Sequence, residues 1–214
     1  AAVTGGVDGA AQAPPAYVRA LFDDYADAFD AHLVGDLGYR GHEAVVAALP
    51  AGRQWAAALD LGCGTGLCGP LLRPRVQRLV GVDLSKRMLA RARALGVYDR
   101  LDGAEIVAWL QACDERFDVV AAADVFIYIG DLAPVFAGVA RVLAPGGAFV
   151  FSAEQPAPGR AMELHAQLRY AHGEAYLRAL AAAAGLEVAA VTSQILRQEQ
   201  ARSVAGLICH LVRP

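Results

Sequence analysis

The sequence predicts one α/β domain in which a doubly wound sheet lies between two layers of helices. Short apolar segments alternate with helical segments through most of the chain, which is typical of parallel strands buried on both faces. A glycine-rich turn directly follows the first of these strands. The last two strands are separated only by the polar segment 197–203, which is too short for a parallel crossover. We therefore expect three layers and seven strands, mostly parallel, with an antiparallel pair at the C-terminal end.

The N-terminal part divides into a tail and a helical region. Residues 1–13 (AAVTGGVDGAAQA) are rich in glycine and alanine, so we expect a flexible tail or a linker that follows another domain. The domain itself is expected over 14–214, and its first part, 14–50, begins with two prolines that suit a first helical turn. Apolar residues then recur every four positions: Tyr17, Leu21, Tyr25 and Phe29. A second short helix is expected over 42–49.

Strands and helices alternate from residue 55 onward. The expected strands are 55–61, 78–83, a weak strand within 96–105, 117–123, 148–153, 186–196 and 204–212. The expected helices are 67–72, 85–95, 133–143 and 174–184, with a short helix after the weak strand. Ser85 is a favourable N-cap, the turn 144–147 (APGG) stops one helix, and Gly185 stops another.

Composition excludes several classes of protein. Apolar residues make up 56% and charged residues 19% of the chain, as in globular proteins. The net charge of −3 offers no excess of cations to neutralise a phosphate backbone, so nucleic acid is disfavoured as a partner. No apolar run is long enough for a membrane span, and no signal-peptide pattern is present. Four cysteines without a CxxC pair, and histidines without ligand spacing, predict reduced thiols in a cytoplasmic protein and no metal site.

The strongest local signal is the segment 59–66 (LDLGCGTG), between the first strand and a helix. Gly62 and Gly64 remove Cβ atoms where a ligand would approach the backbone. A dinucleotide fingerprint needs a third glycine where this chain has Leu67. Asp60 precedes Gly62 by two residues, where an acid repels a diphosphate but favours a ligand with ammonium and sulfonium groups. The loop therefore favours S-adenosylmethionine (SAM) over NAD, and a merely tight turn is the alternative.

A second acid supports a nucleoside ligand. Asp83 ends the second strand, twenty-one residues beyond Gly62. A carboxylate at this place can accept hydrogen bonds from both ribose hydroxyls in doubly wound folds. NAD enzymes share the position, so Asp83 does not separate SAM from NAD.

These segments resemble class I SAM-dependent methyltransferases from about Tyr17 to the C-terminus. The matching segments are LDLGCGTG at 59–66, GVDLSKRMLARA at 81–92, FDVVAAADVFIYIGDL at 117–132 and VLAPGGAFVFS at 142–152. The segments 17–34 and 169–185 are similar to bacterial methyltransferases that often follow tetratricopeptide repeats. The resemblance implies a Rossmann-like fold, and a repeat region would precede the glycine-rich tail.

The resemblance also implies a set of cofactor-binding residues. They are Asp60, Gly62, Cys63, Gly64, Gly66, Asp83, Leu84, Glu105, Ile106, Asp124, Tyr25 and Arg40. The glycines would approach the methionine part of SAM while Asp60 organises their loop. Asp83 would hold the ribose, and Leu84 would pack on the adenine. Asp124 follows the fourth strand, where the family contacts the methionine part.

Three of these assignments carry an alternative. The acid that meets the adenine amino group is Asp102 or Glu105, and we prefer Glu105 because a helical stretch follows it. Tyr25 and Phe29 belong to the helix that closes over the cofactor in the family, unless they are core residues. Arg40 would bind the SAM carboxylate, unless it is an exposed loop cation.

No catalytic residue is assigned, because methyl transfer needs an aligned nucleophile and exclusion of water more than a fixed catalytic group. The candidates are Tyr128, Glu154 and His172, near the ends of the fourth and fifth strands. Glu154 enters a proline-glycine loop that could form the rim of an acceptor site. His172 stands just before a helix, where a surface cap is the more frequent role.

The acceptor is expected to be a small molecule. The segment 124–127 reads DVFI where methyltransferases of nucleobase amines carry Asn/Asp-Pro-Pro-Tyr/Phe, so a nucleobase is disfavoured. A protein or peptide acceptor remains an alternative. Two other functions stay open: a SAM-binding regulatory domain without catalysis, and an NAD(P)-dependent oxidoreductase.

Overall fold

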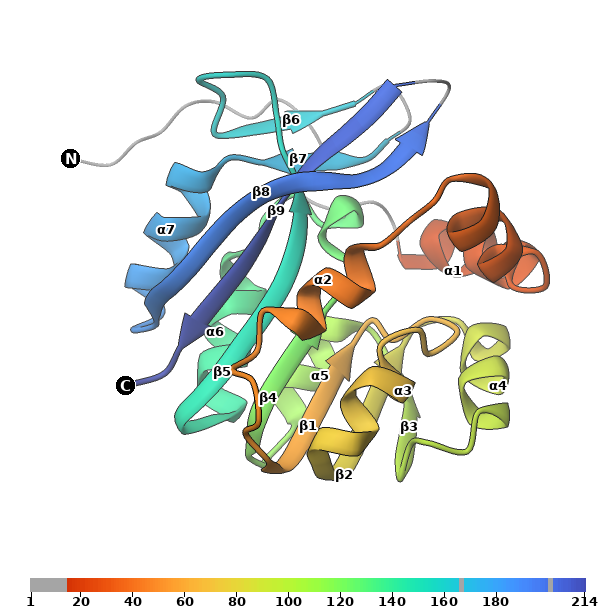
Figure 1. Cartoon of the computed structure of the whole chain (residues 1–214), viewed down its shortest axis with the longest axis horizontal. Helices are drawn as coiled ribbons and strands as arrows, with labels where there is room; N and C mark the ends of the chain where they lie inside the picture. Colours follow the sequence, from red (N-terminus) through yellow and green to blue (C-terminus); the bar gives the residue numbers. More distant parts are fainter. Residues whose placement is uncertain (1–14, 166–167, 200–201) are drawn as a thin grey trace.

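The structure, a computed structural model, describes residues 15–165, 168–199 and 202–214. Its main sheet has seven strands in the order β3-β2-β1-β4-β5-β9-β8 (Figure 1). Strands β1 to β5 pair in parallel, whereas β9 runs antiparallel to both β5 and β8. The predicted fold class, with its antiparallel C-terminal pair, is confirmed. The predicted tail, 1–13, lies outside the described residues.

The strands follow the expected order along the chain. They are β1 (Trp55–Leu61), β2 (Val76–Asp83), β3 (Arg100–Gly103), β4 (Phe117–Ala122), β5 (Leu143–Glu154), β8 (Glu187–Glu199) and β9 (Arg202–Val212). Strand β1 contributes to both apolar clusters, with Ala57, Leu59 and Leu61 in one and Trp55 and Ala58 in the other. The sheet is therefore buried on both faces, as parallel strands require.

Helices cover both faces of the sheet. Those on the first face, in front in Figure 1, are α2 (Gly41–Ala47) and α3 (Gly69–Leu72). Those on the second face are α5 (Ile106–Ala112), α6 (Ala133–Val142) and α7 (Glu174–Ala183). At the β2–β3 edge lie α4 (Lys86–Ala94) and, packed against it, α1 (Pro15–Tyr25). Within the described residues, no helix combines the length and apolar character that crossing a membrane requires.

The predicted turn 144–147 lies inside β5 instead of before it. Leu143 pairs with Phe117 and Ala148 pairs with Val119, so the intervening residues of β5 bulge out of the ladder. Gly146 takes the left-handed conformation, with φ of +71°, that this bulge requires. Residues 144–147 do form a turn, as predicted, but this turn interrupts β5 and does not separate a helix from a strand.

The prediction of a loop at 197–203 is wrong for most of this segment, because residues 197–199 belong to β8 and residues 202–203 to β9. Arg197 pairs with Val204 and Glu199 pairs with Arg202 along the β8–β9 ladder. The side chain of Arg197 is buried and forms an ion pair with Glu154 of β5. Polar residues that neutralise one another inside a fold look the same in the sequence as those of an exposed loop, and this explains the error.

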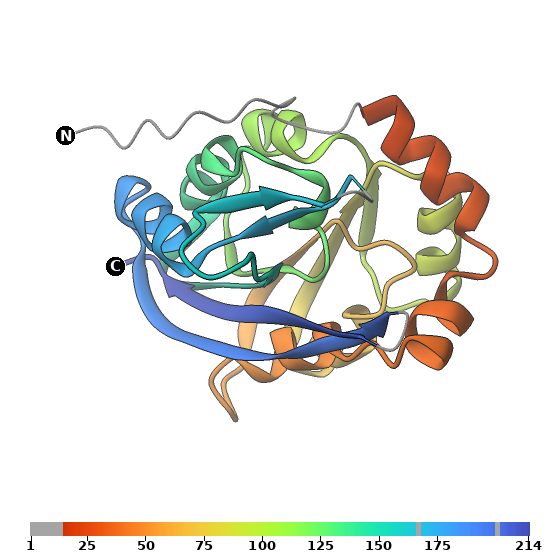
Figure 2. The same ribbon diagram turned by 90° about the horizontal axis from the view of Figure 1, so that it is seen from above.

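A short hairpin and a break in the N-terminal helix were not predicted. Strands β6 (Met162–Leu164) and β7 (Tyr170–His172) form a separate antiparallel pair, and three residues are too few to show an alternating pattern. Helix α1 ends at Tyr25, and a π-helical segment, η1 (Ala31–Asp36), follows after a turn. Figure 2 shows α1 on one side of the molecule, away from the strands β8 and β9.

Candidate functional site

A cavity of about 500 Å³ opens at the carboxyl ends of β1, β2 and β4. Its wall comprises the loops after these strands, α1 and η1, the residues before β7, and the end of β8. This volume is typical of small-molecule and cofactor sites. Open α/β sheets bind ligands at the carboxyl ends of their strands, so we take this cavity as the candidate site.

The glycine-rich loop after β1 presents bare backbone to the cavity. Gly62 and Gly64 have φ of +71° and +54°, a conformation that L side chains rarely adopt. A Cβ on Gly62 would lie 2.5 Å from Val125 Cγ2, whereas one on Gly64 would stand in open space. The amides of Gly62 and Cys63 both donate to Val82 O, which holds the loop against β2. The loop therefore forms a fixed cradle without side chains.

Asp83, at the end of β2, is tied to this loop. Its Oδ2 accepts a hydrogen bond from the Gly64 amide at 2.9 Å, and its Oδ1 accepts one from the Ser85 amide at 2.8 Å. Burial raises the pKa of Asp83, against these backbone N–H groups, which lower it. Each carboxylate oxygen keeps a further acceptor site, so the group can still bind two ligand hydroxyls.

Asp60 lies buried at the end of β1, in the wall of the cavity. The hydroxyl of Tyr98 donates to Asp60 Oδ2 at 2.6 Å. Burial raises the pKa of Asp60 to about 7. A positive charge on a bound ligand would favour its ionised form.

The structure separates the two acids considered for the adenine amino group. Glu105 lies in the cavity wall and caps α5, accepting from the amides of Val107 at 3.0 Å and Ala108 at 2.8 Å. Asp102 lies outside the wall, where it accepts from Trp109 Nε1 at 2.9 Å. The position of Glu105 agrees with the preference stated from the sequence.

Asp124, after β4, lines the cavity in a strained conformation. Its φ of +60° is unusual for a residue other than glycine. The Asp124 amide donates to Ser152 Oγ at 2.8 Å, and Oδ1 accepts from Arg197 Nη1 at 3.3 Å. Burial raises the pKa of Asp124. Strain of this kind is concentrated at functional sites.

The aromatic residues predicted for the lid line the cavity. The rings of Tyr25 and Phe29 meet edge to face, with centroids 5.4 Å apart, and both side chains are only partly buried. They belong to the cavity wall and not to a closed core.

Two hydrogen bonds fasten this N-terminal segment to the residues that follow β1 and β2. Ser85 Oγ donates to Asp23 Oδ1 at 2.6 Å. Thr65 Oγ1, next to Gly64, donates to Asp30 Oδ1 at 2.5 Å. The bend after α1 brings Asp30 to the glycine-rich loop.

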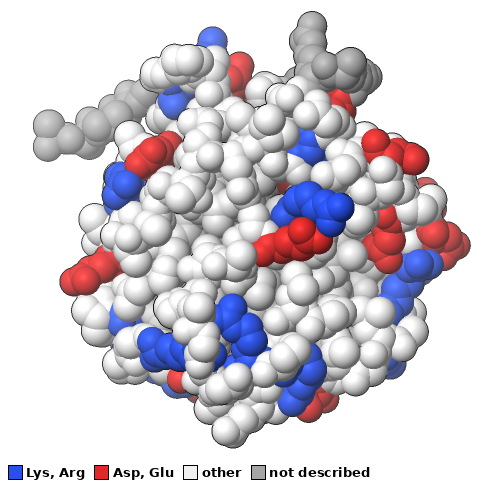
Figure 3. Space-filling model, in the orientation of Figure 1, with Lys and Arg blue, Asp and Glu red and all other residues white. Residues whose placement is uncertain are grey.

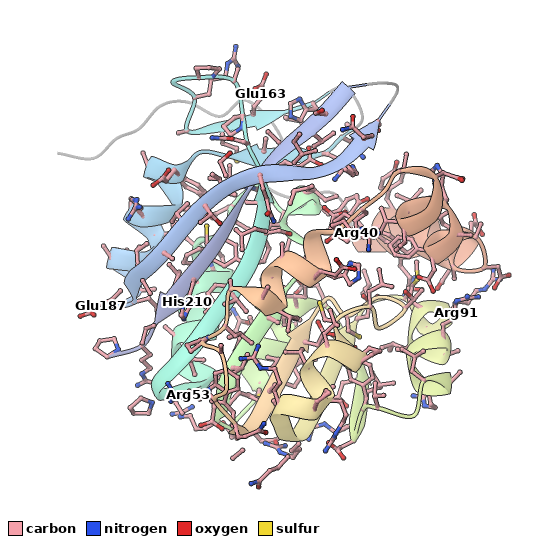
Figure 4. All side chains as sticks on the ribbon, viewed as in Figure 1. Arg40, Arg53, Arg91, Glu163, Glu187 and His210 are labelled. Carbon is pink, nitrogen blue, oxygen red and sulfur yellow. The ribbon has the colours of Figure 1, made fainter. Side chains whose placement is uncertain are left out.

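Arg40 is not in the cavity wall. Its side chain is 66% exposed and pairs with Glu43 at 2.7 Å, beside α2 (Figure 4). His42, two residues further on, lines the cavity with only 8% of its surface exposed. Its ring stacks on Tyr39, and its Nδ1 has no hydrogen-bond partner among the described residues. Burial lowers the pKa of His42.

His42 could not be selected from local patterns, because a single histidine at the start of a helix is usually a surface residue. Only its packing against Tyr39 in the fold places it at the site.

One of the three catalytic candidates lines the cavity. Tyr128, on the 3₁₀ turn η3 (Phe126–Tyr128), contacts Phe22 of α1 edge to face at 5.2 Å. Burial raises the pKa of Tyr128, so its hydroxyl stays protonated near neutral pH.

The other two candidates, Glu154 and His172, do not line the cavity. Glu154 is buried behind the wall in an ion pair with Arg197, and does not form a rim. His172 is buried in β7, with Nε2 3.2 Å from Gly130 O, and Gly173 takes the N-cap position of α7. Burial lowers the pKa of His172 to about 4.

Three charged residues of the wall were missed: Arg169, Arg197 and Glu199. Arg197 and Glu199 lie in the segment read as a polar loop, and Arg169 precedes the unpredicted strand β7. No local pattern distinguishes them from surface charges.

Ten of the twelve residues predicted to bind a cofactor line one cavity. They are Asp60, Gly62, Cys63, Gly64, Asp83, Leu84, Glu105, Ile106, Asp124 and Tyr25. Gly66 lies outside the wall, where a Cβ would come within 2.8 Å of Leu95 Cδ1. Its φ of +95° shapes the turn into α3.

Comparison with known proteins agrees with this geometry. Residues 59–151 match a family model described as a methyltransferase domain. The chain is 32% identical over 111 residues to nodulation protein S of Rhizobium tropici, covering 48% of this chain and 44% of that protein. It is 32% identical over 135 residues to malonyl-(acyl-carrier protein) O-methyltransferase of Enterobacter lignolyticus, covering 63% and 52%. The chain thus spans about half the length of these curated relatives.

A solved structure shows the same fold. The magnesium protoporphyrin IX methyltransferase of Synechocystis PCC 6803, with bound SAM, superposes with a TM-score of 0.69 at 19% identity. The alignment covers 96% of this chain and 100% of that one. The predicted Rossmann-like fold is therefore confirmed.

Proposed function

We propose that this chain is a SAM-dependent methyltransferase that acts on a small molecule. One observation carries the proposal: the bare backbone of Gly62 and Gly64 and the carboxylate of Asp83 meet in one cavity and are joined by a hydrogen bond. The match of residues 59–151 to a methyltransferase domain supports it. Attachment of the chain to tetratricopeptide repeats stays a prediction.

The residues of the cavity fit the parts of SAM. Asp83 would accept hydrogen bonds from the ribose hydroxyls, and Glu105 would accept one from the adenine amino group. The space at Gly64 suits a ligand pressed against the backbone. Asp60 would supply negative charge at the end where the ammonium and sulfonium would lie.

His42 would bind the SAM carboxylate, which is the role that the sequence predicts for Arg40. It is a buried donor in the wall whose Nδ1 lacks a partner among the described residues, and leaving such a group unsatisfied costs stability. A carboxylate bound beside the ring would provide that partner. Arg40, exposed and paired with Glu43, would not be required.

The chemistry requires little from the protein beyond placement. Bound SAM supplies a methyl group already activated by the adjacent sulfonium. The residues of α1 and η1 would exclude water, and the wall near Tyr128 would hold the nucleophile in line. Because its pKa is raised, Tyr128 would act as a hydrogen-bonding group in its neutral form and not as a phenolate base.

The shape and charge of the molecule support a small acceptor. The site is a cavity partly covered by α1, and not an open groove. Figure 3 shows charges of both signs scattered over the face viewed there, with one gathering of basic side chains at its lower end. A nucleic acid would need a continuous basic surface at the site.

Calorimetric titration with SAM, S-adenosylhomocysteine (SAH) and NAD tests the cofactor. We expect SAM and SAH to bind and NAD not to bind. Binding of NAD with no binding of SAM would overturn the proposal. Incubation with methyl-labelled SAM and a panel of metabolites then tests turnover, and saturable SAM binding with no transfer to any panel member would favour a regulatory domain.

A further inference from the structure

Three exposed apolar residues of the cavity wall, which we call its apolar mouth, lie far from the glycine-rich loop in sequence. Tyr17 and Leu21 of α1 and Leu168 before β7 line this mouth, although 47%, 39% and 51% of their surfaces are exposed. Three large apolar side chains around one opening form a surface that a ligand can cover.

The backbone holds Leu168 in this exposed position. Its φ of +59° is rare for a residue other than glycine. The turn is closed by two hydrogen bonds, from the Leu168 amide to His165 O at 2.9 Å and from the His165 amide to Arg169 O at 2.8 Å. A strained backbone that displays a leucine to solvent indicates a ligand-contacting position.

Arg169, the neighbour of Leu168 in the cavity wall, belongs to a group of five charged side chains. Arg169 pairs with Glu199 at 2.5 Å, and its buried Nε lies 3.8 Å from Glu154 Oε1. Arg197 contacts Glu154, and also Asp124 at 3.3 Å and Glu199 at 3.5 Å. Three carboxylates thus surround two guanidinium groups.

The net negative charge of this group favours a positively charged acceptor over a negatively charged one. Both guanidinium groups are already engaged by carboxylates, so an anionic ligand would meet an excess of negative charge in a partly buried site. A cationic ligand would balance the third carboxylate. Tyr128, the neutral hydroxyl of this wall, can accept a hydrogen bond from such a group.

We infer that the methyl acceptor is an apolar amine, held with its nitrogen near Glu199 and Tyr128 and its apolar part at Tyr17, Leu21 and Leu168. This inference rests on the proposed methyltransferase function. The ammonium group loses one proton to solvent before transfer. The nitrogen lone pair then forms the N–CH₃ bond while the C–S bond breaks and its electron pair stays on sulfur, so the product is a methylammonium ion and a neutral thioether.

Three probes of equal length test the charge preference. The protein is first titrated with SAH, and failure of SAH to bind counts against the proposed function, not against the amine. The SAH complex is then titrated with hexylamine, hexanol and hexanoate. We expect hexylamine to bind at least tenfold more tightly than hexanoate, with hexanol between them. Equal binding, or tighter binding of hexanol or hexanoate, would overturn the inference.

A matched pair of variants tests Glu199. We expect Glu199→Gln to reduce the preference for hexylamine over hexanoate about tenfold, because two carboxylates then face two guanidinium groups and the net negative charge is lost. Glu187→Gln changes a glutamate at the opposite end of β8 (Figure 4) and should leave the preference unchanged. An unchanged preference in Glu199→Gln, with SAH still bound, would mean that this charged group does not determine the preference for a cationic ligand.

A second pair tests the mouth. Each methylene buried by the protein strengthens binding about fourfold, so hexylamine, with two more methylenes, should bind about fifteenfold more tightly than butylamine. We expect Leu168→Asp to abolish this chain-length effect. Leu164→Asp, an exposed leucine of β6 outside the cavity wall, should retain it. If Leu168→Asp retained the chain-length effect, the apolar part of the amine would bind elsewhere on the protein.

Discussion

The amide of Gly64 donates a hydrogen bond to Asp83 Oδ2 at 2.9 Å, joining the loop after β1 to the end of β2. The two parts that would hold the methionine and the ribose of SAM are therefore one unit. A change in the carboxylate affects both the ribose contact and the position of the glycine backbone.

Replacement of Asp83 by Asn tests this unit. The amide side chain keeps the size of Asp83 but loses one acceptor for the ribose hydroxyls and for the Gly64 and Ser85 amides. We expect SAM affinity to fall by about ten- to a hundredfold, since hydrogen bonds to charged groups contribute about 1.5–3 kcal/mol. Isothermal titration measures the loss, with thermal unfolding as the control for folding. Undiminished affinity would show that the ribose lies elsewhere.

The pair Glu105→Gln and Asp102→Asn tests the adenine contact. Glu105 lies in the cavity wall and Asp102 does not. We expect Glu105→Gln to weaken SAM binding about tenfold, because the amide offers a single carbonyl acceptor that the α5 amides also need. Asp102→Asn should change binding less than twofold. A larger effect from Asp102 would reverse the assignment.

The pair His42→Ala and Arg40→Ala tests the carboxylate contact. We expect His42→Ala to lower the affinity for SAM about tenfold and to leave that for 5′-methylthioadenosine, which has no carboxylate, unchanged. Arg40→Ala should alter neither, because its side chain is exposed and paired with Glu43. A selective loss in Arg40→Ala would restore the original expectation from the sequence.

His172 predicts how stability depends on pH. Its folded pKa of about 4 lies below the unfolded value of 6.5, so the unfolded chain binds more protons between these pH values. Its contribution is therefore present above pH 6.5 and is lost as the pH falls toward 4, by up to about 3 kcal/mol. Chemical denaturation at pH 7.5, 5.5 and 4.5 measures this loss. His172→Phe should remove this part of the pH dependence, and an identical slope in the variant would assign it to other groups.

The part of the cavity wall around the glycine-rich loop could be predicted because its signals are local. The glycine spacing of the loop after β1 and the acid at Asp83 are each readable within a few residues of their strands. Glu105 could be preferred over Asp102 because a helix begins beside it.

The acceptor side could not be predicted, because it is assembled from distant segments. Tyr17, Leu168 and Glu199 meet only in the folded chain, and Glu199 belongs to a polar run that was read as a loop. The prediction that Arg40 lies at the site is wrong for a related reason. Its charge would suit a carboxylate, but in the folded chain its side chain is exposed to solvent.

The position of β9 has a consequence for the order in which the protein can form during synthesis. β9 is the last strand of the chain, yet it lies between β5 and β8. A nascent chain can therefore complete the loops around Gly64, Asp83 and Glu105 well before β8 has a neighbour to pair with. Because Arg197 and Glu199 reach the cavity only when β8 is docked, the acceptor half of the site is completed last. The newly made chain would thus acquire its cofactor before it could select a substrate.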